Sequence, residues 1–412
     1  MIKLPSPLDK DWESRKYGRV GDRRRILSDR GLRQAINAGL MSFTPALDLS
    51  DDCRIQPVTI DLKFKEVEGL EPLSRGFGDC ISRGPVLLPG QRSTVVLTEQ
   101  IEFEPGRQSD YTTDRELSVR GFDGRYLLPS IEARSSLRRL GCFVCPPNIV
   151  FNSADGLQFD VGNFGPNPVQ LSYGDRFAQM FVFVEPYQDV APTLEHLFDG
   201  CKETERGSLV RSLDMGVEVS TRREFALLVK EGYLSVSPNA EFRGGRLVVH
   251  ASNVAYRMKK LDKPIDFNKR DELGDVVEPI DICRGYRVEN RDHVVVETVE
   301  QLKLSPHVAI RFWDNLYGFT GEPVDRSFAH LASFADGLRN LSVIGLTDGL
   351  VDPGYEGGFS RQPKWLTGRV IHPGDILGFG QVFFFPNGVE RPYGSKVLGS
   401  QYQGKERTVF SK

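Results

Sequence analysis

Short apolar runs broken by glycine- and proline-containing turns make up most of the hydrophobic pattern of this chain. The run from Met180 to Val184 predicts a buried β-strand, because no polar residue interrupts it. Ser28 is expected to N-cap a short helix that ends near Gly39. The apolar face of that helix would carry Leu32, Ala35 and Ile36. With 41 glycines and 25 prolines in 412 residues, the pattern favours a mostly β protein with many turns.

Parts of this pattern recur about 200 residues further along. The matches at an offset of 200 are residues 95–98 with 295–298, Gly174-Asp175 with Gly374-Asp375, and Arg139 with Arg339. A second helix is expected from Thr221 to Gly232, at an offset of 193 from the first. Its apolar face would carry Phe225, Leu228 and Val229. A nearly constant offset at several places predicts two copies of one β-rich domain.

The predicted division places copy one at residues 1–190, a linker at 191–214 and copy two at 215–412. A chain of this length exceeds one typical domain, which agrees with a division into two. Copy one and copy two denote residues 1–190 and 215–412.

Composition limits the classes of function. The formal net charge of −3 argues against a nucleic-acid polymer as partner, although a single nucleotide needs only a local basic pocket. Cys142 and Cys145 have C-x2-C spacing, but no second pair of Cys or His stands at a zinc-finger distance. The Phe and Val between these two cysteines favour a β-strand with alternating side chains over a metal site. No apolar stretch reaches about 18 residues, so we expect no membrane contact and a cytoplasmic, reduced protein.

Two polar segments carry candidate chemistry. Residues 134–141 read Arg-Ser-Ser-Leu-Arg-Arg-Leu-Gly, and residues 174–179 read Gly-Asp-Arg-Phe-Ala-Gln. The first supplies two hydroxyls and several guanidinium groups, whose planar donor forks suit phosphate oxygens. In this order the segments resemble the dCTP deaminase and dUTPase family. Residues 26–32, 55–62 and 401–405 resemble that family's opening, first strand motif and C-terminal closing segment.

The resemblance implies a fold and an activity. The expected fold is mainly β, with two tandem dUTPase-like distorted barrels or jelly rolls, each led by a short helix. The expected activity is hydrolytic deamination of dCTP to dUTP and ammonia without zinc, because the zinc-deaminase signature of H-x-E with P-C-x-x-C is missing. Two alternatives stay open: a dUTP pyrophosphatase, and an inactive nucleotide-binding regulator. Family members usually form oligomers, so a homo-oligomer is also expected.

The two copies have kept different parts of the family's motifs. Copy one has Arg134, Ser135, Ser136 and Arg139, where copy two has Phe334, Ala335, Asp336 and Arg339. Copy two has the segment 349–357, which resembles the family's aspartate segment and carries Asp352 and Tyr355. Copy one has Asn-Ser-Ala-Asp-Gly at 152–156 and lacks that aspartate at the aligned position. One composite site made from both copies is therefore predicted.

The resemblance assigns the catalytic roles as follows. The family's acid–base glutamate stands three residues before an Asn-x-Gly, which places Asp160 there in copy one and Gln362 in copy two. An aspartate is one methylene shorter than the family's glutamate, and a glutamine cannot act as a base. Ser135 would help hold the attacking water and Arg139 would contact it or the base edge. Asp352 would lie beside the nucleotide, or activate water in the pyrophosphatase alternative.

The remaining expected contacts are with the nucleotide. Arg134, Ser136, Arg176 and Gln179 would serve the phosphates, and Tyr402 and Gln403 belong to the closing segment. Asp61 would bind the sugar or brace a loop, and Tyr355 would cover the deoxyribose face or belong to the core. The triphosphate is expected to arrive with Mg²⁺, coordinated mainly by phosphate oxygens and water.

Overall fold

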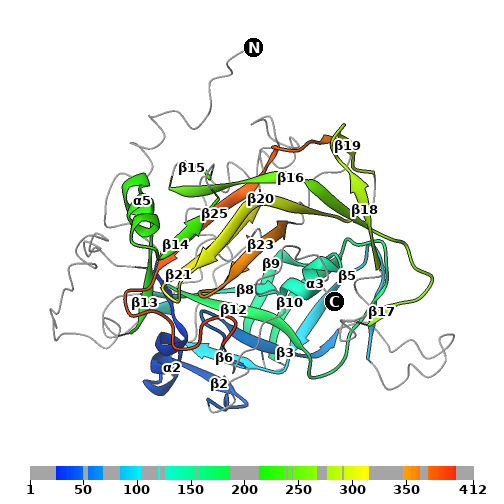
Figure 1. Cartoon of the computed structure of the whole chain (residues 1–412). Helices are drawn as coiled ribbons and strands as arrows, with labels where there is room; N and C mark the ends of the chain where they lie inside the picture. Colours follow the sequence, from blue (N-terminus) through cyan, green and yellow to red (C-terminus); the bar gives the residue numbers. More distant parts are fainter. Residues whose placement is uncertain are drawn as a thin grey trace.

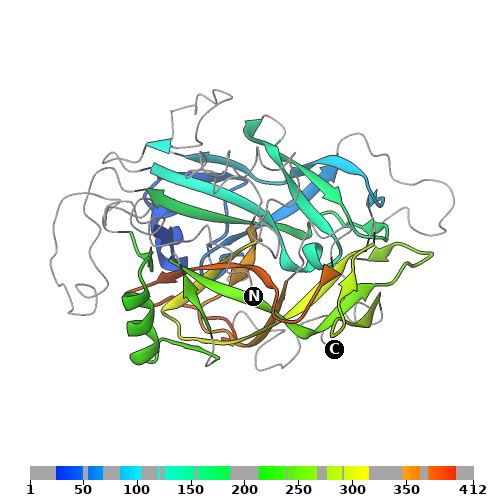
Figure 2. The same ribbon diagram turned by 90° about the horizontal axis from the view of Figure 1, so that it is seen from above.

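The computed structural model describes residues 25–49, 54–67, 84–103, 119–120, 126–153, 156–185, 213–237, 240–243, 245–266, 276–289, 292–314, 347–361 and 370–395. Figures 1 and 2 show copy one, in blue to teal, lying against copy two, in green to red. Strands form both halves. The mainly β class predicted from the sequence is confirmed.

The elements of copy one begin with β1 and end with β12. They are β1 (Arg25–Leu27), α2 (Asp29–Asn37), β2 (Met41–Thr44), β3 (Ile60–Val67), β4 (Val86–Leu87), β5 (Arg92–Leu97), β6 (Gln100–Phe103), β7 (Val119–Arg120), β8 (Tyr126–Ala133), α3 (Ser135–Arg139), β9 (Cys142–Ser153), β10 (Gly156–Asn163), β11 (Val169–Gln170) and β12 (Arg176–Glu185).

The elements of copy two follow a similar order. They are β13 (Met215–Glu218), α5 (Arg222–Lys230), β14 (Leu234–Val236), β15 (Phe242–Arg243), β16 (Arg246–Met258), β17 (Ile265–Asp266), β18 (Val277–Asp281), β19 (Tyr286–Arg287), β20 (Val294–Leu304), β21 (Val308–Asp314), β22 (Thr347–Val351), β23 (Glu356–Arg361), β24 (Val370–Ile371) and β25 (Ile376–Phe384).

Each copy folds around one central antiparallel strand. In copy one β12 pairs with β8 and β3, and β3 continues by pairing with β5, which pairs with β10. In copy two β25 takes the place of β12, between β21 and β16, and β16 pairs onward with β20. Successive strand residues point to opposite faces, so alternate residues of β3 and β12 fill the core of copy one, including Leu62, Ala178 and Met180. This arrangement agrees with the two tandem jelly-roll-like units expected.

The leading helices confirm the repeat. Ser28 caps α2 by accepting a hydrogen bond from the Gly31 amide at 3.1 Å, and Thr221 caps α5 by accepting one from the Glu224 amide at 3.2 Å. The two capping residues are 193 positions apart, as predicted. The predicted apolar face of α5 is wrong at Val229, which is 43% exposed, because the buried stripe of this short helix is carried by Phe225 and Leu228.

A matching turn precedes the central strand in each copy. Asp175 accepts a hydrogen bond from the Ser172 amide at 3.1 Å, and Asp375 accepts one from the His372 amide at 2.7 Å. The preceding residues, Gly174 and Gly374, have φ values of 80° and 85°. A left-handed backbone of this kind favours glycine. The repeated Gly-Asp pair therefore marks one turn built twice.

The first strands of the two copies join them into one sheet. β1 pairs antiparallel with β13, with Ile26 opposite Gly216, and each also pairs with the central strand of its own copy. A hydrophobic cluster at this junction contains Ile26, Val58, Phe181, Phe183, Ala309, Phe383, Phe385 and Val389. A second junction is the parallel pairing of β11 with β17. Contacts between the copies are therefore extensive.

The strand predicted over 55–62 is confirmed only from Ile60, because residues 55–59 form a turn in which the Gln56 amide donates to the Thr59 carbonyl at 2.7 Å. The predicted boundaries of the copies stay a prediction, since 186–212 lie outside the described residues. In the described part of the chain, no helix combines the length and the apolar character needed to cross a membrane.

Candidate functional site

A buried carboxylate, Asp61 of β3, gathers polar side chains on the face of copy one opposite its core. Arg176 places Nη1 at 3.3 Å from Oδ2, and Gln179 donates Nε2–H to Oδ1 at 3.4 Å. The Nε of Arg134 lies 3.7 Å from Oδ1. Burial raises the pKa of Asp61, and the guanidinium groups of Arg134 and Arg176 oppose that rise. Asp61 therefore holds two arginines and an amide in one place.

Asp352 reaches the same place from copy two. It follows β22, and the turn closes through a hydrogen bond from the Tyr355 amide to the Asp352 carbonyl at 3.2 Å. The residue as a whole is half-buried, but Oδ1 is buried and has no hydrogen-bond partner within the described ranges. Burial raises the pKa of Asp352 to about 7; the nearby Asp61 carboxylate adds to the rise and Arg134 opposes it. Asp352 is therefore electrostatically coupled to Arg134 of the arginine segment within one chain, and the composite site itself stays a prediction.

The raised pKa of Asp352 predicts a pH-dependent stability. The folded protein holds this proton more tightly than the unfolded chain, whose aspartate pKa is about 3.8, so stability should fall as the pH rises from about 4 to about 7. Asp352→Asn removes the effect, and each pKa unit corresponds to about 1.4 kcal/mol. The variant should therefore melt several degrees above the wild type at pH 8 and close to it at pH 4, in melting curves recorded across this range.

Asp281 offers a control of opposite sign. The Cys283 amide donates to its carboxylate at 2.8 Å and lowers its pKa. Its ionised form therefore favours the fold, and that contribution is present above the unfolded pKa and lost as the pH falls. Asp281→Asn should gain no stability at pH 8. Equal melting behaviour of the Asp352 and Asp281 variants would contradict the interpretation.

Helix α3 brings the Arg-Ser-Ser segment to the boundary with copy two. Arg134 is its N-cap residue, Ser135 is exposed, Ser136 is half-buried, and Arg139 is buried at the last turn. The end of the helix packs against the Asn163-Phe164-Gly165 loop, where the Phe164 amide donates to the Gly141 carbonyl at 2.8 Å. A Cβ on Gly165 would lie 2.4 Å from the Leu140 carbonyl oxygen, so only glycine fits there. The Asn-x-Gly motif therefore fixes the position of α3.

A buried ion network ties α3 to copy two. Glu132, at the end of β8, places Oε2 at 3.6 Å from Arg138 Nη1 and accepts a hydrogen bond from Arg311 Nη2 at 2.8 Å. Arg311 belongs to β21 and is fully buried. Its guanidinium also lies 4.9 Å from the Phe183 ring centroid, within the range of a cation–π contact. Arg311 of copy two thus binds the same Glu132 carboxylate of copy one that pairs with Arg138.

Gly349 of β22 completes this contact. Its φ of 113° is a conformation that side chains rarely adopt, and a Cβ there would lie 2.3 Å from Arg138 Nη2. The glycine therefore allows α3 to approach β22. From Arg134 to Arg138, the helix faces residues 352 and 349 of copy two in turn.

Asp160 has a different surrounding. It lies on β10, and its carboxylate accepts hydrogen bonds from Arg92 Nε at 3.0 Å and Thr94 Oγ1 at 2.9 Å, both on β5. Arg92 Nη2 is 2.7 Å from the same carboxylate. The Asp61 cluster instead stands on β3, α3 and β12. The assignment of Asp160 as acid–base residue stays a prediction.

Other predicted residues are placed as follows. Tyr355 is buried in the core of copy two, donates its hydroxyl to the Gly358 carbonyl, and lies beside Tyr393 at a centroid distance of 5.8 Å. That surrounding matches the core alternative for this residue. Tyr402, Gln403 and Gln362, together with residues 334–339, lie outside the described residues.

Strand register shows that copy two lacks the polar row of copy one. Gln179 stands opposite Asp61, and the corresponding pair in copy two is Phe379 opposite Val248. The residue at the place of Arg176, offset by 200, is Ile376. Val248, Phe379 and Ile376 are all apolar and cannot bind an anion in this way. Only copy one retains the cation side of the site at these positions.

Glu132 and Arg311 were not predicted as functional residues. A signal existed, because each is a charged residue within a mostly apolar strand, 127–133 and 308–313, where a solvated surface strand would alternate polar and apolar residues. The contact between them was not readable, since it joins strands about 180 residues apart. In the part of the chain that the structure describes, no group of three or more His, Cys, Asp or Glu is arranged to hold a metal.

No family model matches the chain. Among curated relatives, it is 36% identical over 90 residues to a protein named dCTP deaminase, dUMP-forming, from Corynebacterium jeikeium, covering 20% of this chain and 48% of that relative. The chain thus spans about half the length of that relative. With the protein of the same name from Corynebacterium glutamicum it shares 26% identity over 206 residues, covering 46% of this chain and 93% of the relative.

A solved structure matches much more of the chain. The crystal structure of 2'-deoxycytidine 5'-triphosphate deaminase from Agrobacterium tumefaciens superposes with a TM-score of 0.54 and covers 88% of this chain and 99% of its own. The chain is similar in sequence to curated dCTP deaminases and shares the fold of a solved one. The sequence identity to that structure is 15%, so the superposition supports the fold alone. The roles of the individual site residues depend on their own geometry.

Proposed function

We propose that this protein deaminates dCTP by hydrolysis in a composite site formed by copy one and copy two. The observation that carries the proposal is the approach of the 349–352 segment of copy two to α3, where Gly349 lies against Arg138 and Asp352 is electrostatically coupled to Arg134 and Asp61. A nucleoside triphosphate needs cations at one end, and Arg134 and Arg176 stand together there. The relatives' names, dCTP deaminase, dUMP-forming, support the same substrate.

Asp61 would act by orienting cations and not by touching the nucleotide. Its carboxylate is fully buried, whereas the Arg176 side chain is 38% exposed. A guanidinium carries five N–H donors, so an arginine fixed by a carboxylate on one side can offer others to phosphate oxygens. Gln179, bound to the same carboxylate, adds a neutral amide beside them. This ordering lowers the entropy that is lost when the triphosphate binds.

Asp352 is suited to contact the nucleotide itself. A carboxyl with a pKa of about 7 is partly protonated at neutral pH, so it can donate a hydrogen bond as well as accept one. A proton-transfer group works best when its pKa lies near the working pH. Asp352 would therefore bind the sugar end during deamination. In a second step it would be placed to activate a water for cleavage of the triphosphate.

That second step is favoured by one observation, the words dUMP-forming in the relatives' names. Deamination alone would leave dUTP, which was the product expected from the sequence. Formation of dUMP requires release of diphosphate as well. The proposal is deamination first, with dUTP as its immediate product and diphosphate release as the candidate further step.

The proposed reaction uses no protein-bound zinc, and Mg²⁺ would accompany the triphosphate as part of the substrate. The measurement is ammonia and pyrophosphate release, followed separately, from purified protein given dCTP or dUTP with Mg²⁺ alone, together with the metal content of the active protein. Ammonia from dCTP with less than stoichiometric zinc is expected. Binding of dCTP without either product would instead support the regulator alternative, and tightly bound zinc whose removal stops turnover would refute the zinc-free reaction.

A further inference from the structure

The contacts between the copies follow a fixed order along α3 and the residues after it. Arg134 meets Asp352, Arg138 meets Gly349, and Phe143 meets His293 with ring centroids 6.1 Å apart. The cation cluster therefore stands at the beginning of α3. The start of β20 stands beyond its end, against β9. A nucleotide lying along α3 with its phosphates at Arg134 would direct its base toward β20.

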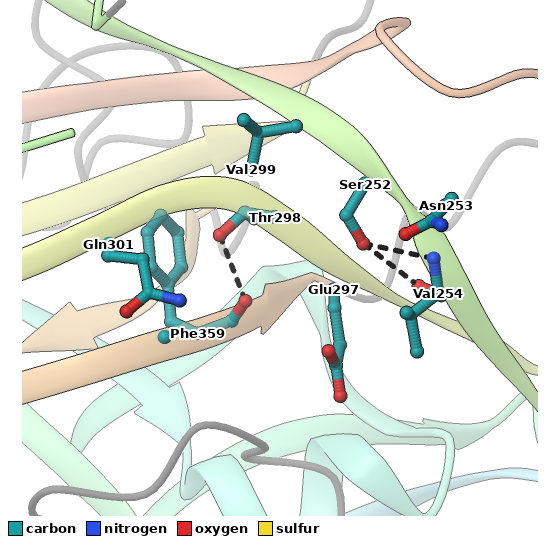
Figure 3. A pocket seen from close by; sticks show the side chains of 9 residues that line it. Ser252, Asn253, Val254, Glu297, Thr298, Val299, Gln301 and Phe359 are labelled. Carbon is teal, nitrogen blue, oxygen red and sulfur yellow. Dashed lines mark hydrogen bonds between the residues drawn. The ribbon is translucent and has the colours of Figure 1, made fainter. Parts of the chain in front are cut away.

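One carboxylate projects from this part of β20. Residues 294–296 pair with β16 in regular register, and Val296 and Glu297 pair with successive residues of β23, so side chains alternate as far as Glu297, which shares a face with Val295 and His293. That face meets copy one at His293, which contacts Phe143, and the neighbouring Val295 is fully buried. Figure 3 shows the Glu297 side chain directed away from Val299, on the side where the pale cyan ribbons of copy one lie.

The neighbourhood of Glu297 is polar and hollowed. Ser360 of β23 stands directly opposite Glu297 in the strand pairing, and its hydroxyl is buried with no hydrogen-bond partner in the described part of the chain. Glu297 also lines a pocket of about 360 Å³ with Ser252, Thr298 and Gln301. A carboxylate with a hydroxyl beside it can orient a water and take a proton from it.

We propose that Glu297 is the acid–base carboxylate of the composite site, in the place that the sequence assigned to Asp160. This inference depends on the proposed dCTP deamination. Asp160 is bound by Arg92 and Thr94 on copy one's own β5, whereas Glu297 lies on the same face of copy two as His293, which contacts Phe143 of β9 shortly after α3. The copy that lost the arginine segment would thus supply both Asp352 and the base.

The step balances without a metal or redox partner. Glu297 accepts a proton from water as the water oxygen forms a bond to C4 of cytosine, and passes that proton to ring N3. Glu297 then accepts the proton of the new C4 hydroxyl and passes it to N4. The C4–N4 bond breaks with its electron pair going to nitrogen, so that ammonia leaves, the C4 carbonyl forms and Glu297 is again ionised. One proton of the water ends on N3 and the other on ammonia.

Glu297→Gln tests this assignment because it keeps the shape and removes the base. Ammonia release from dCTP should fall by about 10²-fold or more, with dCTP binding measured by calorimetry and the melting temperature both unchanged. Glu297→Asp, which keeps the charge on a shorter arm, should retain intermediate activity and the acidic limb of the kcat/KM pH profile that the glutamine variant loses. Glu356→Gln is the matched control on β23, since Glu356 is exposed and pairs with Lys303 at 3.0 Å; it should turn over like the wild type.

The possible failures are distinguishable. If the wild type releases ammonia and Glu297→Gln does so equally well, this inference is overturned and the proposed function stands. If Asp160→Asn loses turnover while Glu297→Gln keeps it, the assignment from sequence is correct. If the wild type releases no ammonia from dCTP, both proposals fall. Should Glu297→Gln unfold, Glu297→Asp still decides, because wild-type kcat and an unchanged pH profile in that variant would contradict a role in proton transfer.

Discussion

Ser135→Ala and Asp352→Asn are each expected to lower ammonia release from dCTP by about 10²-fold or more, although the two residues are more than 200 positions apart. Ser135 is an exposed hydroxyl on the first turn of α3, directly after Arg134, and Asp352 is electrostatically coupled to that arginine. Each change removes one side of the composite site and leaves the other intact. The measurement is steady-state turnover with dCTP binding determined in parallel.

Mixing the two inactive variants tests which halves combine. The structure joins Asp352 to Arg134 within one chain, so a mixture should restore no activity. Partial recovery would show that each site is shared between chains. Ser235→Ala, at an exposed serine of β14, is the matched control and should keep full turnover. A fully active Asp352→Asn variant would instead show that copy two contributes only structure at this position.

Glu132→Gln should destabilise the fold by about 3–5 kcal/mol, the range for breaking a buried ion pair by removing one partner. Without the Glu132 carboxylate, Arg138 and Arg311 would each lose their ion pair with it at the boundary between the copies. Urea unfolding measures the loss. Glu356→Gln, which breaks the exposed pair with Lys303, should cost no more than about 1 kcal/mol.

A double-mutant cycle separates the buried network from general damage. Arg311→Met removes the cation that copy two contributes, so Glu132→Gln combined with Arg311→Met should cost less than the sum of the single changes. Turnover should fall with Glu132→Gln because Arg138 lies on α3, between Arg134 and Arg139. Strict additivity of the two changes would show that the ion network does not couple the copies.

The periodic parts of the fold were readable from the sequence. Ser28 and Thr221 are capping residues with local hydrogen-bond partners, and Gly174 and Gly374 mark turns whose geometry depends on neighbouring residues. Local rules are sufficient for such elements. The strand expected at 55–59 failed because a turn closed by Gln56 and Thr59 competes with an extended backbone at that place.

The site was only partly readable because its members come from distant strands. Sequence alone paired Asp352 with the arginine segment through motifs that each copy had kept, and the structure brings these residues together. Nothing in the sequence indicated that Asp61 would bind Arg134 and Arg176, since that contact depends on the register between β3 and β12. Glu297 was missed for the same reason. Its position relative to α3 depends on how the copies pack, through contacts such as Phe143 with His293.

The loss of the polar row from copy two has a consequence for divergence after duplication. In an assembly of identical chains, a substitution at the position of Asp61 would appear at every site at once. Here Val248, Phe379 and Ile376 stand at the corresponding places of one half only, and the covalently attached other half still carries Asp61, Gln179 and Arg176. Fusion keeps both halves at equal abundance, so each is free to lose what its neighbour supplies. With the proposed composite site, such a pair could no longer revert to independent single units, because neither half alone would encode a complete set of ligand contacts.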